Sequence, residues 1–281
     1  MDKKARSRWQ EPPQVFGLLG NPVAHSLSPA MHRAAFRAMG LEAEYVAFQV
    51  VDLPSAIAGL RGLGLRGGSI TIPFKEQVIP LLDEVDEVAL KIGAVNTILN
   101  SGGRLTGHNT DWAGFLNALS SHVEIRGESF AILGGGGAAR AAAYGIMSSG
   151  GRAIILNRDP QRARKVALEL GCLCHPLERL GEVQAQVLIN TTPVGMSPRE
   201  DESPVSREML GKFKLVMDMV YNPVRTKLLR EAQEEGAVTI TGVEMFVQQG
   251  ADQIRLWTHM EPPLEVMRQV VLGHLEQGHG D

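Results

Sequence analysis

The sequence predicts an α/β protein of two domains. Apolar runs of strand length alternate along the chain with amphipathic segments of helix length, which is typical of mostly parallel sheets covered by helices. The chain has 281 residues, 44% of them hydrophobic, which is enough for one large or two medium cores. A second series of alternating elements begins near Asp111, and we therefore expect two domains.

The first series of elements ends near residue 110. Its expected strands are residues 15–20, 45–51 and 69–73. A helix over 29–39 is indicated because Pro29 suits a first helical turn and Gly40 a C-terminal stop. Asp52 is a suitable N-cap for a helix over 52–60, and the chain from Phe74 onward is also expected to be helical.

The second series has the same alternation. Its expected strands are residues 129–133, 152–157, 185–190, 215–219 and 238–240. Its expected helices are residues 137–148 and 160–170. Residues 243–278 have a helical pattern in two pieces, separated by Pro262 and Pro263. The expected division is a flexible leader at 1–14, a first domain at 15–110, a second at 111–241, and terminal helices at 242–281 that return to the first domain.

Composition and charge exclude several classes of function. The net charge of -3 has no basic excess, so we expect no nucleic-acid partner. No apolar run approaches the ~20 residues of a membrane-spanning helix. Cys172 and Cys174 are the only cysteines, which is too few for a disulfide framework or a zinc site, and the eight histidines lack metal-ligand spacing. We expect a cytoplasmic protein with free thiols and no metal.

A glycine-rich loop between an expected strand and an expected helix predicts a Rossmann-type dinucleotide site. Gly134, Gly136 and Ala139 fit the pattern G-x-G-x-x-A: the first glycine permits the tight turn, the second lets the backbone approach a pyrophosphate, and the alanine allows close helix packing. The helix N-terminus supplies free N–H groups for phosphates. The residues expected to bind the cofactor here are Gly134, Gly135, Gly136, Gly137, Ala138 and Ala139.

The end of the next strand indicates which dinucleotide is bound. Enzymes that use NAD usually carry an acidic residue there, whereas this chain has Asn157 and Arg158, with Arg162 one helical turn later. A guanidinium can pair with the 2′-phosphate of NADP. Asp159 would repel that phosphate if it turned toward it, but would be partly neutralised if it capped the following helix. NADP is the expected cofactor.

Nine ordered motifs, from Val15 to about Pro263, carry a resemblance to a known family. They are GNPVAHSLSPAMH (20–32), SITIPFK (69–75), GAVNT (93–97), GHNTD (107–111), the glycine loop, NR (157–158), NTTPVGM (190–196), DMVYNP (218–223) and GVEMFVQQG (242–250). On these motifs the chain resembles the shikimate dehydrogenase family. The resemblance implies an N-terminal substrate domain, a Rossmann NADP domain, and the reversible reduction of 3-dehydroshikimate to shikimate with NADPH, a step of aromatic amino-acid biosynthesis.

The resemblance also implies the site. It makes Lys75 and Asp111 the catalytic pair. The residues that it implies for substrate binding are Ser26, Ser28, Thr71, Asn96, Tyr221 and Gln249. It sets Met219, Gly242 and Met245 along the nicotinamide. Gln248, adjacent to Gln249, is an alternative for the glutamine.

Each of these residues also has a reading from its chemistry. Ser26 and Ser28 precede an expected helix, where short hydroxyls suit a carboxylate or cap the helix. Lys75 alone could be a surface residue, and Asp111 alone could be an N-cap. Together, each would favour the charged form of the other, and the ammonium could donate a proton to a carbonyl oxygen as that oxygen gains charge.

Two departures from the family pattern leave alternatives open. Ser69 stands where the family usually has Asn, and Asp159 is the third residue of the family's Asn-Arg-Thr motif. Asp159 is the sole support for a quinate/shikimate dehydrogenase that accepts NAD. A catalytically dead sensor of the same ligands is disfavoured because Lys75 and Asp111 are both present. The sequence does not decide between a monomer and a homodimer.

Overall fold

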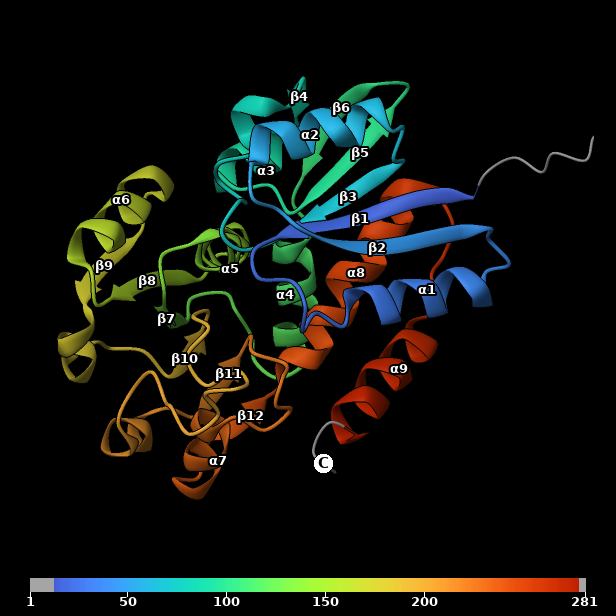
Figure 1. Cartoon of the computed structure of the whole chain (residues 1–281). Coiled ribbons are helices and arrows are strands. Elements are labelled where there is room, and N and C mark those ends of the chain that lie inside the picture. Colours follow the sequence, from blue (N-terminus) through green and yellow to red (C-terminus); the bar gives the residue numbers. More distant parts are fainter. Residues whose placement is uncertain (1–12, 278–281) are drawn as a thin grey trace, which may run out of the picture.

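Two six-stranded sheets organise residues 13–277, the part of the chain that the computed structural model describes (Figure 1). The predicted α/β class is confirmed. The expected leader lies outside these residues except at its end, where Gln14 already belongs to the first strand.

The first sheet has the strand order β2-β1-β3-β5-β6-β4. Its strands are β1 (Gln14–Gly20), β2 (Ala43–Gln49), β3 (Gly67–Ile70), β4 (Glu84–Val85), β5 (Thr97–Ser101) and β6 (Arg104–His108). β1 pairs in parallel with β2 and β3, whereas β5 is antiparallel to both β3 and β6. The β5–β6 hairpin turns on Gly102 and Gly103, both with positive φ, which a two-residue hairpin of type I′ requires.

The second sheet is entirely parallel, with the order β12-β11-β10-β7-β8-β9. Its strands are β7 (Ser129–Leu133), β8 (Arg152–Asn157), β9 (Leu173–Pro176), β10 (Val187–Asn190), β11 (Leu215–Asp218) and β12 (Val238–Ile240). This is the doubly wound Rossmann order. From β7 the chain adds β8 and β9 on one side and then returns to add β10, β11 and β12 on the other side. Ligands bind such sheets in the crevice between β7 and β10, where the order of the strands reverses.

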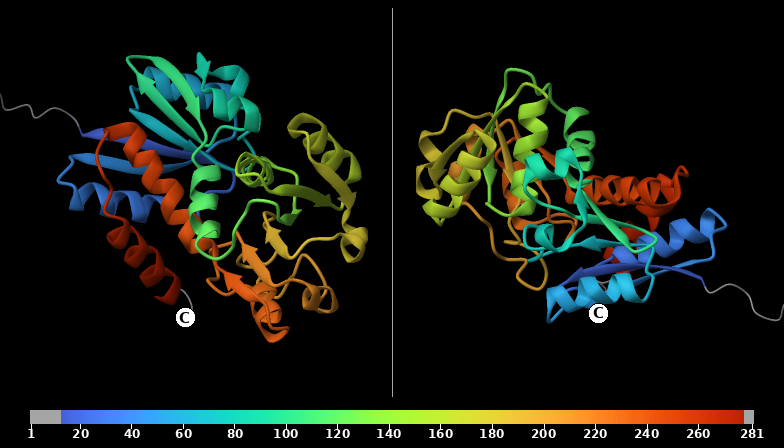
Figure 2. Two further views of the ribbon diagram at one scale, coloured as in Figure 1. Left: turned by 180° about the vertical axis from the view of Figure 1, so that it is seen from behind. Right: turned by 90° about the horizontal axis from the view of Figure 1, so that it is seen from above.

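Nine α-helices accompany the sheets within residues 13–277. They are α1 (Ser28–Ala38), α2 (Leu53–Gly62), α3 (Glu87–Ile92), α4 (Asp111–Ser120), α5 (Gly137–Ser148), α6 (Pro160–Leu170), α7 (Lys227–Glu234), α8 (Gly242–Thr258) and α9 (Leu264–Gln277). α4 packs along α8 in the middle of the molecule, and α9 packs on α1 (Figures 1 and 2). None of these helices is both long and apolar enough to cross a membrane.

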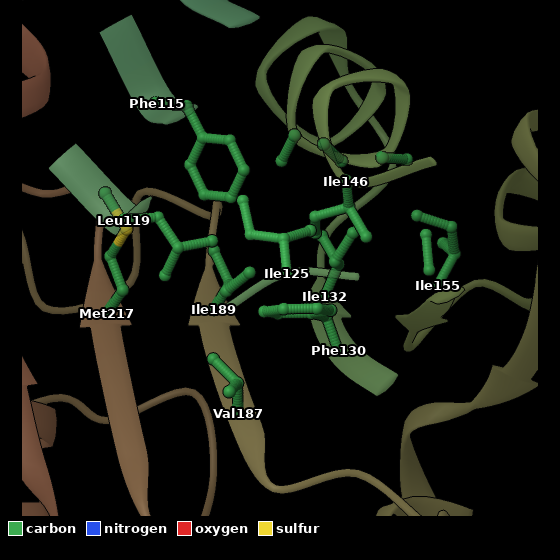
Figure 3. Packing of buried hydrophobic residues seen from close by; sticks show 14 of the residues in the cluster. Phe115, Leu119, Ile125, Phe130, Ile132, Ile146, Ile155, Val187, Ile189 and Met217 are labelled. Carbon is green, nitrogen blue, oxygen red and sulfur yellow. The ribbon is translucent and has the colours of Figure 1, made fainter. Parts of the chain in front are cut away.

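Alternation along β1 and β7 builds a core on each face of each sheet. Phe16 of β1 is buried with α1, α8 and α9, whereas Leu19 is buried on the opposite face with α2. In β7, Phe130 packs toward α4 and α5 (Figure 3). α8 contributes to two clusters, because Val247 lies in the α1–α9 cluster and Met245 in the cluster of the second sheet. This shared helix fixes the two sheets relative to each other.

The helix expected from Phe74 onward is wrong. Residues 71–78 form turns, followed by a short 3-10 helix, η1 (Ile79–Leu81). The carbonyl of Lys75, which a helix would use internally, instead accepts a hydrogen bond of 2.8 Å from the N–H of Val95. The sequence analysis also missed β4, α3, β5, β6, β9 and α7.

Candidate active site

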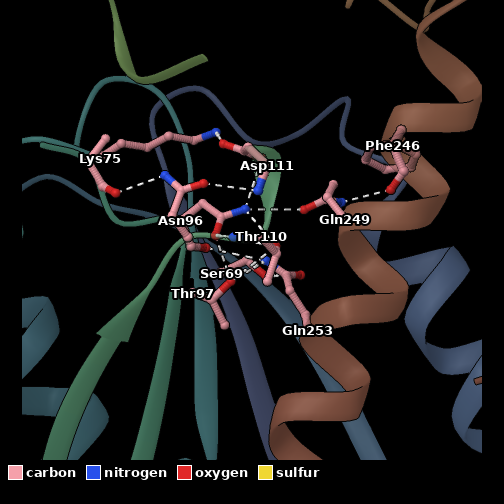
Figure 4. A network of polar contacts seen from close by, with 11 residues as sticks. Ser69, Lys75, Asn96, Thr97, Thr110, Asp111, Phe246, Gln249 and Gln253 are labelled. Carbon is pink, nitrogen blue, oxygen red and sulfur yellow. Dashed lines mark hydrogen bonds and ion pairs between the residues drawn. The ribbon is translucent and has the colours of Figure 1, made fainter. Parts of the chain in front are cut away.

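Lys75 and Asp111 form an ion pair between the two sheets. Nζ of Lys75 lies 2.5 Å from Oδ2 of Asp111, and the two side chains are 17% and 6% exposed. Oδ1 of Asp111 accepts a hydrogen bond of 2.8 Å from Nδ2 of Asn96 (Figure 4). The carboxylate is therefore held on both oxygens, and the ammonium has two further N–H donors for another group.

Backbone hydrogen bonds bring the three segments of this cluster together. Val95 donates to the carbonyl of Lys75, so the lysine loop lies beside the segment that carries Asn96. Asn109 donates from Nδ2 to the carbonyl of Ala94 and accepts from the N–H of Asp111. Asp111 is the first residue of α4 rather than its N-cap, which is Thr110, so its carboxylate is free to pair with Lys75.

Asn96 is 2% exposed, and its amide group is fully hydrogen-bonded. Oδ1 accepts from the backbone N–H of Thr110 at 2.8 Å and from Oγ1 of Thr97 at 2.7 Å. Nδ2 donates to Asp111, to Oγ1 of Thr110 at 2.9 Å, and at 3.5 Å to Oε1 of Gln249. These partners fix which end of the amide faces Asp111.

Of the adjacent pair Gln248 and Gln249, it is Gln249 whose side chain contacts Asn96. Its Nε2 also donates to the carbonyl of Phe246 at 2.8 Å. The approach of α8 to α4 depends on Gly114, because a Cβ there would lie 2.8 Å from the backbone nitrogen of Gln249.

Ser26, Ser28 and Tyr221 gather at the start of α1. The two serine hydroxyls are 3.2 Å apart, and Ser26 Oγ accepts from the N–H of Ser28. Neither serine is the N-cap of α1, which is Leu27. The ring of Tyr221 stacks on Phe246 at 4.1 Å between centroids, and burial raises the pKa of Tyr221 against the effect of hydrogen bonds with Leu27 and Ser26.

Thr71 lies half-buried beyond the end of β3. Its N–H donates to the carbonyl of Leu19, and a Cβ at Gly20 would lie 2.2 Å from its Cγ2. Gly20 therefore leaves the space that Thr71 occupies where β1 and β3 end.

The glycine loop has the shape of a phosphate cradle. Gly134 has φ +134, and a Cβ there would lie 2.2 Å from Oγ1 of Thr191. A Cβ at Gly135 would lie 2.7 Å from Nδ2 of Asn157. Gly136 is the N-cap of α5 and gives it no side-chain cap, so the N–H groups of the first turn remain available. These residues, with Ala138 and the buried Ala139, fit a dinucleotide pyrophosphate.

The cradle adjoins the ion pair. A Cβ at Gly137, the first residue of α5, would lie 2.9 Å from Cδ and 3.0 Å from Cβ of Lys75. Lysine and glycine loop therefore belong to a single site.

Asp159 is the N-cap of α6. Its Oδ1 accepts from the N–H groups of Gln161 and Arg162 at 2.9 and 3.3 Å. Arg162 extends over the glycine loop, where Nε donates to the carbonyl of Gly135 at 3.0 Å. Arg158 is exposed, and neither Arg158 nor Arg162 is in an ion pair with a carboxylate within residues 13–277. The guanidinium of Arg158 and the two terminal nitrogens of Arg162 are thus available to a phosphate.

Gly242 brings the start of α8 against the end of β11. A Cβ there would lie 2.6 Å from the carbonyl oxygens of both Met219 and Val220. Met219 and Met245 pack at the edge of the hydrophobic cluster that faces α4 and α5. The three residues expected along the nicotinamide therefore lie together.

Asp218 is a supporting residue that the sequence analysis did not single out. It is buried, and its carboxyl accepts from Asn190 at 2.9 Å, Thr226 at 2.7 Å and the N–H of Val220 at 3.0 Å. Burial raises the pKa of Asp218 to about 7, against the effect of these three donors. The network braces the loop that carries Tyr221. The sequence signal for Asp218 was the pair of polar motifs at 190–196 and 218–223, which contain Asn190 and Asp218.

A lysine–aspartate ion pair beside a glycine loop at the start of a helix is the arrangement expected in a nucleotide-dependent dehydrogenase. Residues 18–98 match the shikimate dehydrogenase substrate binding domain, and residues 242–272 match the shikimate 5'-dehydrogenase C-terminal domain. The chain belongs to the shikimate dehydrogenase family.

Relatives match nearly the whole chain. A shikimate dehydrogenase (NADP(+)) of Pyrococcus abyssi is 44% identical over 94% of this chain and 100% of its own. The corresponding enzyme of Methanopyrus kandleri is 46% identical over 93% and 96%. The crystal structure of shikimate 5-dehydrogenase from Thermus thermophilus, in complex with NADP(H) and shikimate, superposes with a TM-score of 0.84 at 40% identity, over 92% of this chain and 99% of the other.

Proposed function

We propose that this chain is an NADP-dependent shikimate dehydrogenase, which reversibly reduces 3-dehydroshikimate to shikimate with NADPH in aromatic amino-acid biosynthesis. The observation that carries the proposal is the ion pair of Lys75 and Asp111 beside Gly137 of the glycine loop. A proton donor and a hydride donor must act on the same carbonyl group, and the contact between Lys75 and the glycine loop supports such a shared site. The family and the names of its relatives support the same activity.

Lys75 is the proposed proton donor. NADPH, when bound, supplies the hydride. As hydride reaches the carbonyl carbon, the carbonyl oxygen gains charge, and Nζ of Lys75 stabilises it and gives it a proton. Asp111 holds Nζ of Lys75 in place through the ion pair, and Asp111 is itself held by Asn96. In the oxidative direction Lys75 takes the proton back.

The substrate carboxylate is proposed to bind Ser26 and Ser28. Their hydroxyls lie 3.2 Å apart at the start of α1, where short hydroxyls and a helix N-terminus suit an acid. Tyr221, directed toward Ser26, is the proposed third donor at this end. At the other end, the proposed partners of the substrate hydroxyls are Thr71, Asn96 and Gln249.

The cofactor is proposed to bind along the second sheet. The glycine loop holds the pyrophosphate, and Arg158 and Arg162 pair with the 2′-phosphate beside Asn157. Met219, Gly242 and Met245 line the nicotinamide. The corresponding division of the chain is residues 15–110 with 242–281 for substrate and 111–241 for NADP.

The position of Asp159 supports NADP over the alternative with NAD. That alternative rested on Asp159 turning toward the ribose, whereas the Asp159 carboxylate is engaged by two N–H groups of α6. A dead sensor is disfavoured by the intact ion pair. We further propose a cytoplasmic enzyme without nucleic-acid partners, working as a monomer or homodimer.

A steady-state matrix tests the proposal. Shikimate and quinate are each assayed with NADP and with NAD. The expected result is the highest kcat/KM for shikimate with NADP. Turnover of quinate with NAD at equal or higher efficiency would replace the proposal with the quinate alternative, and absence of turnover in all four assays would favour the sensor.

A further inference from the structure

Beneath the ion pair, a row of buried polar side chains connects the first sheet to α8 (Figure 4). Gln253, 1% exposed, lies one helical turn after Gln249. Its Oε1 accepts from Oγ of Ser69 at 2.8 Å, and Ser69 in turn accepts from the hydroxyl of Tyr45 at 2.6 Å. Both hydrogen bonds of Ser69 thus stay within this row, so the residue that departs from the family's Asn is engaged away from the ion pair.

The other end of Gln253 faces the catalytic cluster. Nε2 donates to Oγ1 of Thr97 at 3.1 Å and to the backbone carbonyl of Asn96 at 3.3 Å. Because Thr97 accepts from Gln253, its own hydroxyl hydrogen is directed to Oδ1 of Asn96 at 2.7 Å. Asn96 then presents Nδ2 to Asp111.

All donors in this row point in the same direction. Tyr45 donates to Ser69, Ser69 to Gln253, Gln253 to Thr97, Thr97 to Asn96, and Asn96 to the Asp111 carboxylate. Hydrogen bonds in such a chain polarise one another, and a low-dielectric interior strengthens the effect. Reversing the Gln253 amide would set its NH₂ against Ser69 and its oxygen against the carbonyl of Asn96.

We propose that Gln253 is a positioning residue that, through Thr97, orients the Asn96 amide toward Asp111 and so holds the Lys75–Asp111 pair, with Ser69 and Tyr45 supporting Gln253 from behind. The inference rests on the proposed function for the role of the pair. The backbone N–H of Thr110 also binds Oδ1 of Asn96, so Gln253 is one of two anchors and its removal weakens the pair without abolishing it.

The ionisable groups around this row are few. His32 stacks on the Tyr45 ring at 4.2 Å between centroids, and its burial lowers its pKa to about 4, so it stays neutral. Burial raises the pKa of Tyr45, which keeps its proton as a donor. Lys75 is the cation on Asp111. Changes along the row therefore reach the pair by hydrogen bonding rather than by a new charge.

The test removes hydrogen bonds of the row at three positions that lie progressively further from Asp111. Gln253→Met keeps the length of the side chain but removes the amide oxygen and nitrogen. Ser69→Ala removes the hydrogen bond from Ser69 to Gln253, and Tyr45→Phe removes the hydrogen bond from Tyr45 to Ser69. We expect kcat/KM for shikimate to fall about tenfold for Gln253→Met and progressively less for the other two, with KM for NADP within about twofold of the parent. The fall should lie mainly in kcat, with KM for shikimate changing less, because the row acts on the position of the Lys75–Asp111 pair.

A matched control is Asn100→Leu. Asn100 is likewise buried in β5, where its side chain donates to the carbonyl of Leu65 and accepts from the N–H of Gly103, at the far end of the strand from Thr97. It should lose stability while its kcat matches that of the parent. An equal fall of kcat in Asn100→Leu, or a parent-like kcat in Gln253→Met, would overturn the inference. If Gln253→Met does not fold, the graded pair of Ser69→Ala and Tyr45→Phe decides in the same way.

A readout without turnover separates this inference from the proposed function. In a crystal structure of Gln253→Met, or of Ser69→Ala if the first does not fold, the distance from Asn96 Nδ2 to Asp111 Oδ1 should exceed the 2.8 Å of the parent chain. An unchanged contact contradicts the positioning role even if the enzyme is active. An inactive parent with a displaced Asn96 amide contradicts the proposed function alone.

Discussion

Gly137 packs directly against Lys75, so the first turn of α5 is in contact with the proposed proton donor. A Cβ at Gly137 would lie 2.9 Å from Cδ of Lys75. Real Cβ atoms do not approach that closely, so the lysine side chain, which pairs with Asp111, would have to shift.

Gly137→Ala should therefore lower kcat about tenfold or more, because a small misplacement of a reacting group is costly. Gly59→Ala is the control, since Gly59 is in α2 with open space at its Cβ position, and the change should stabilise that helix by about 1 kcal/mol. Steady-state kinetics and urea unfolding of both variants check this. Turnover of Gly137→Ala equal to that of the parent would mean that Lys75 can give way without loss.

Removal of either member of the ion pair tests the proton chemistry. Lys75→Ala should reduce kcat by ~10²–10⁴-fold, the usual contribution of general acid–base catalysis, with NADP binding retained. Asp111→Asn keeps the shape but removes the charge that holds Nζ, so it should also slow the reaction. Lys91→Ala, at an exposed pair with Glu87, is the control and should leave kcat unchanged. A loss below threefold in a folded Lys75→Ala protein would remove Lys75 from the mechanism.

His32 gives the protein a predicted loss of stability in acid. Burial lowers the pKa of His32 to about 4, whereas an unfolded histidine titrates near ~6.5. The unfolded chain therefore takes up this proton first, and stability falls as the pH drops from about 6.5 to about 4, by about 3 kcal/mol in total.

His32→Phe keeps an aromatic ring on Tyr45 and removes this titration. At pH 7 it should be less stable than the parent by about 1 kcal/mol, for the lost hydrogen bond to the carbonyl of Ser28. That deficit should shrink or reverse at pH 4.5, as measured by urea unfolding at both values. His274→Gln, on the exposed side of α9, serves as the control. A deficit that is constant with pH would contradict the assigned cause.

The sequence predicted the second sheet better than the first. Strands 152–157 and 238–240 and helices 137–148 and 160–170 match the structure, because a parallel sheet of buried apolar runs and capped helices has a strong local pattern. The β5–β6 hairpin was missed because its strands mix polar and apolar residues, which reflects polar side chains such as Asn96 and Asn100 buried in or beside it.

The candidate site shows the same limit. The ordered motifs singled out Lys75, Asn96 and Asp111 as residues of one site. In the structure Asp111 contacts both of the others, and the roles of all three stay predictions. Gln253 lies outside those motifs. Its only signal was its position four residues after Gln249, on a helix face that by pattern could equally be core. Its role depends on Thr97 and Ser69, which are far from it in sequence.

We expect the preference for NADP over NAD to depend on Arg158 and Arg162 and on the direction in which the Asp159 carboxylate points. Asp159 caps α6, so its charge is partly neutralised by the helix N-terminus and the two guanidinium groups beside it stay available. We expect kcat/KM to be higher with NADP than with NAD. Arg158→Ala should reduce that ratio about tenfold or more, since a hydrogen bond to a charged group contributes ~1.5–3 kcal/mol.

Asp159→Thr is the informative counterpart, because threonine retains a cap while removing the carboxylate. It should raise the NADP/NAD ratio with little change in stability, as measured by kcat/KM with each cofactor and by thermal unfolding. Asp159→Ala, which loses the cap as well, should cost ~1 kcal/mol and separates the two effects. If the unmodified protein used NAD as efficiently as NADP, or if Arg158→Ala left the ratio unchanged, a different group would have to recognise the 2′-phosphate.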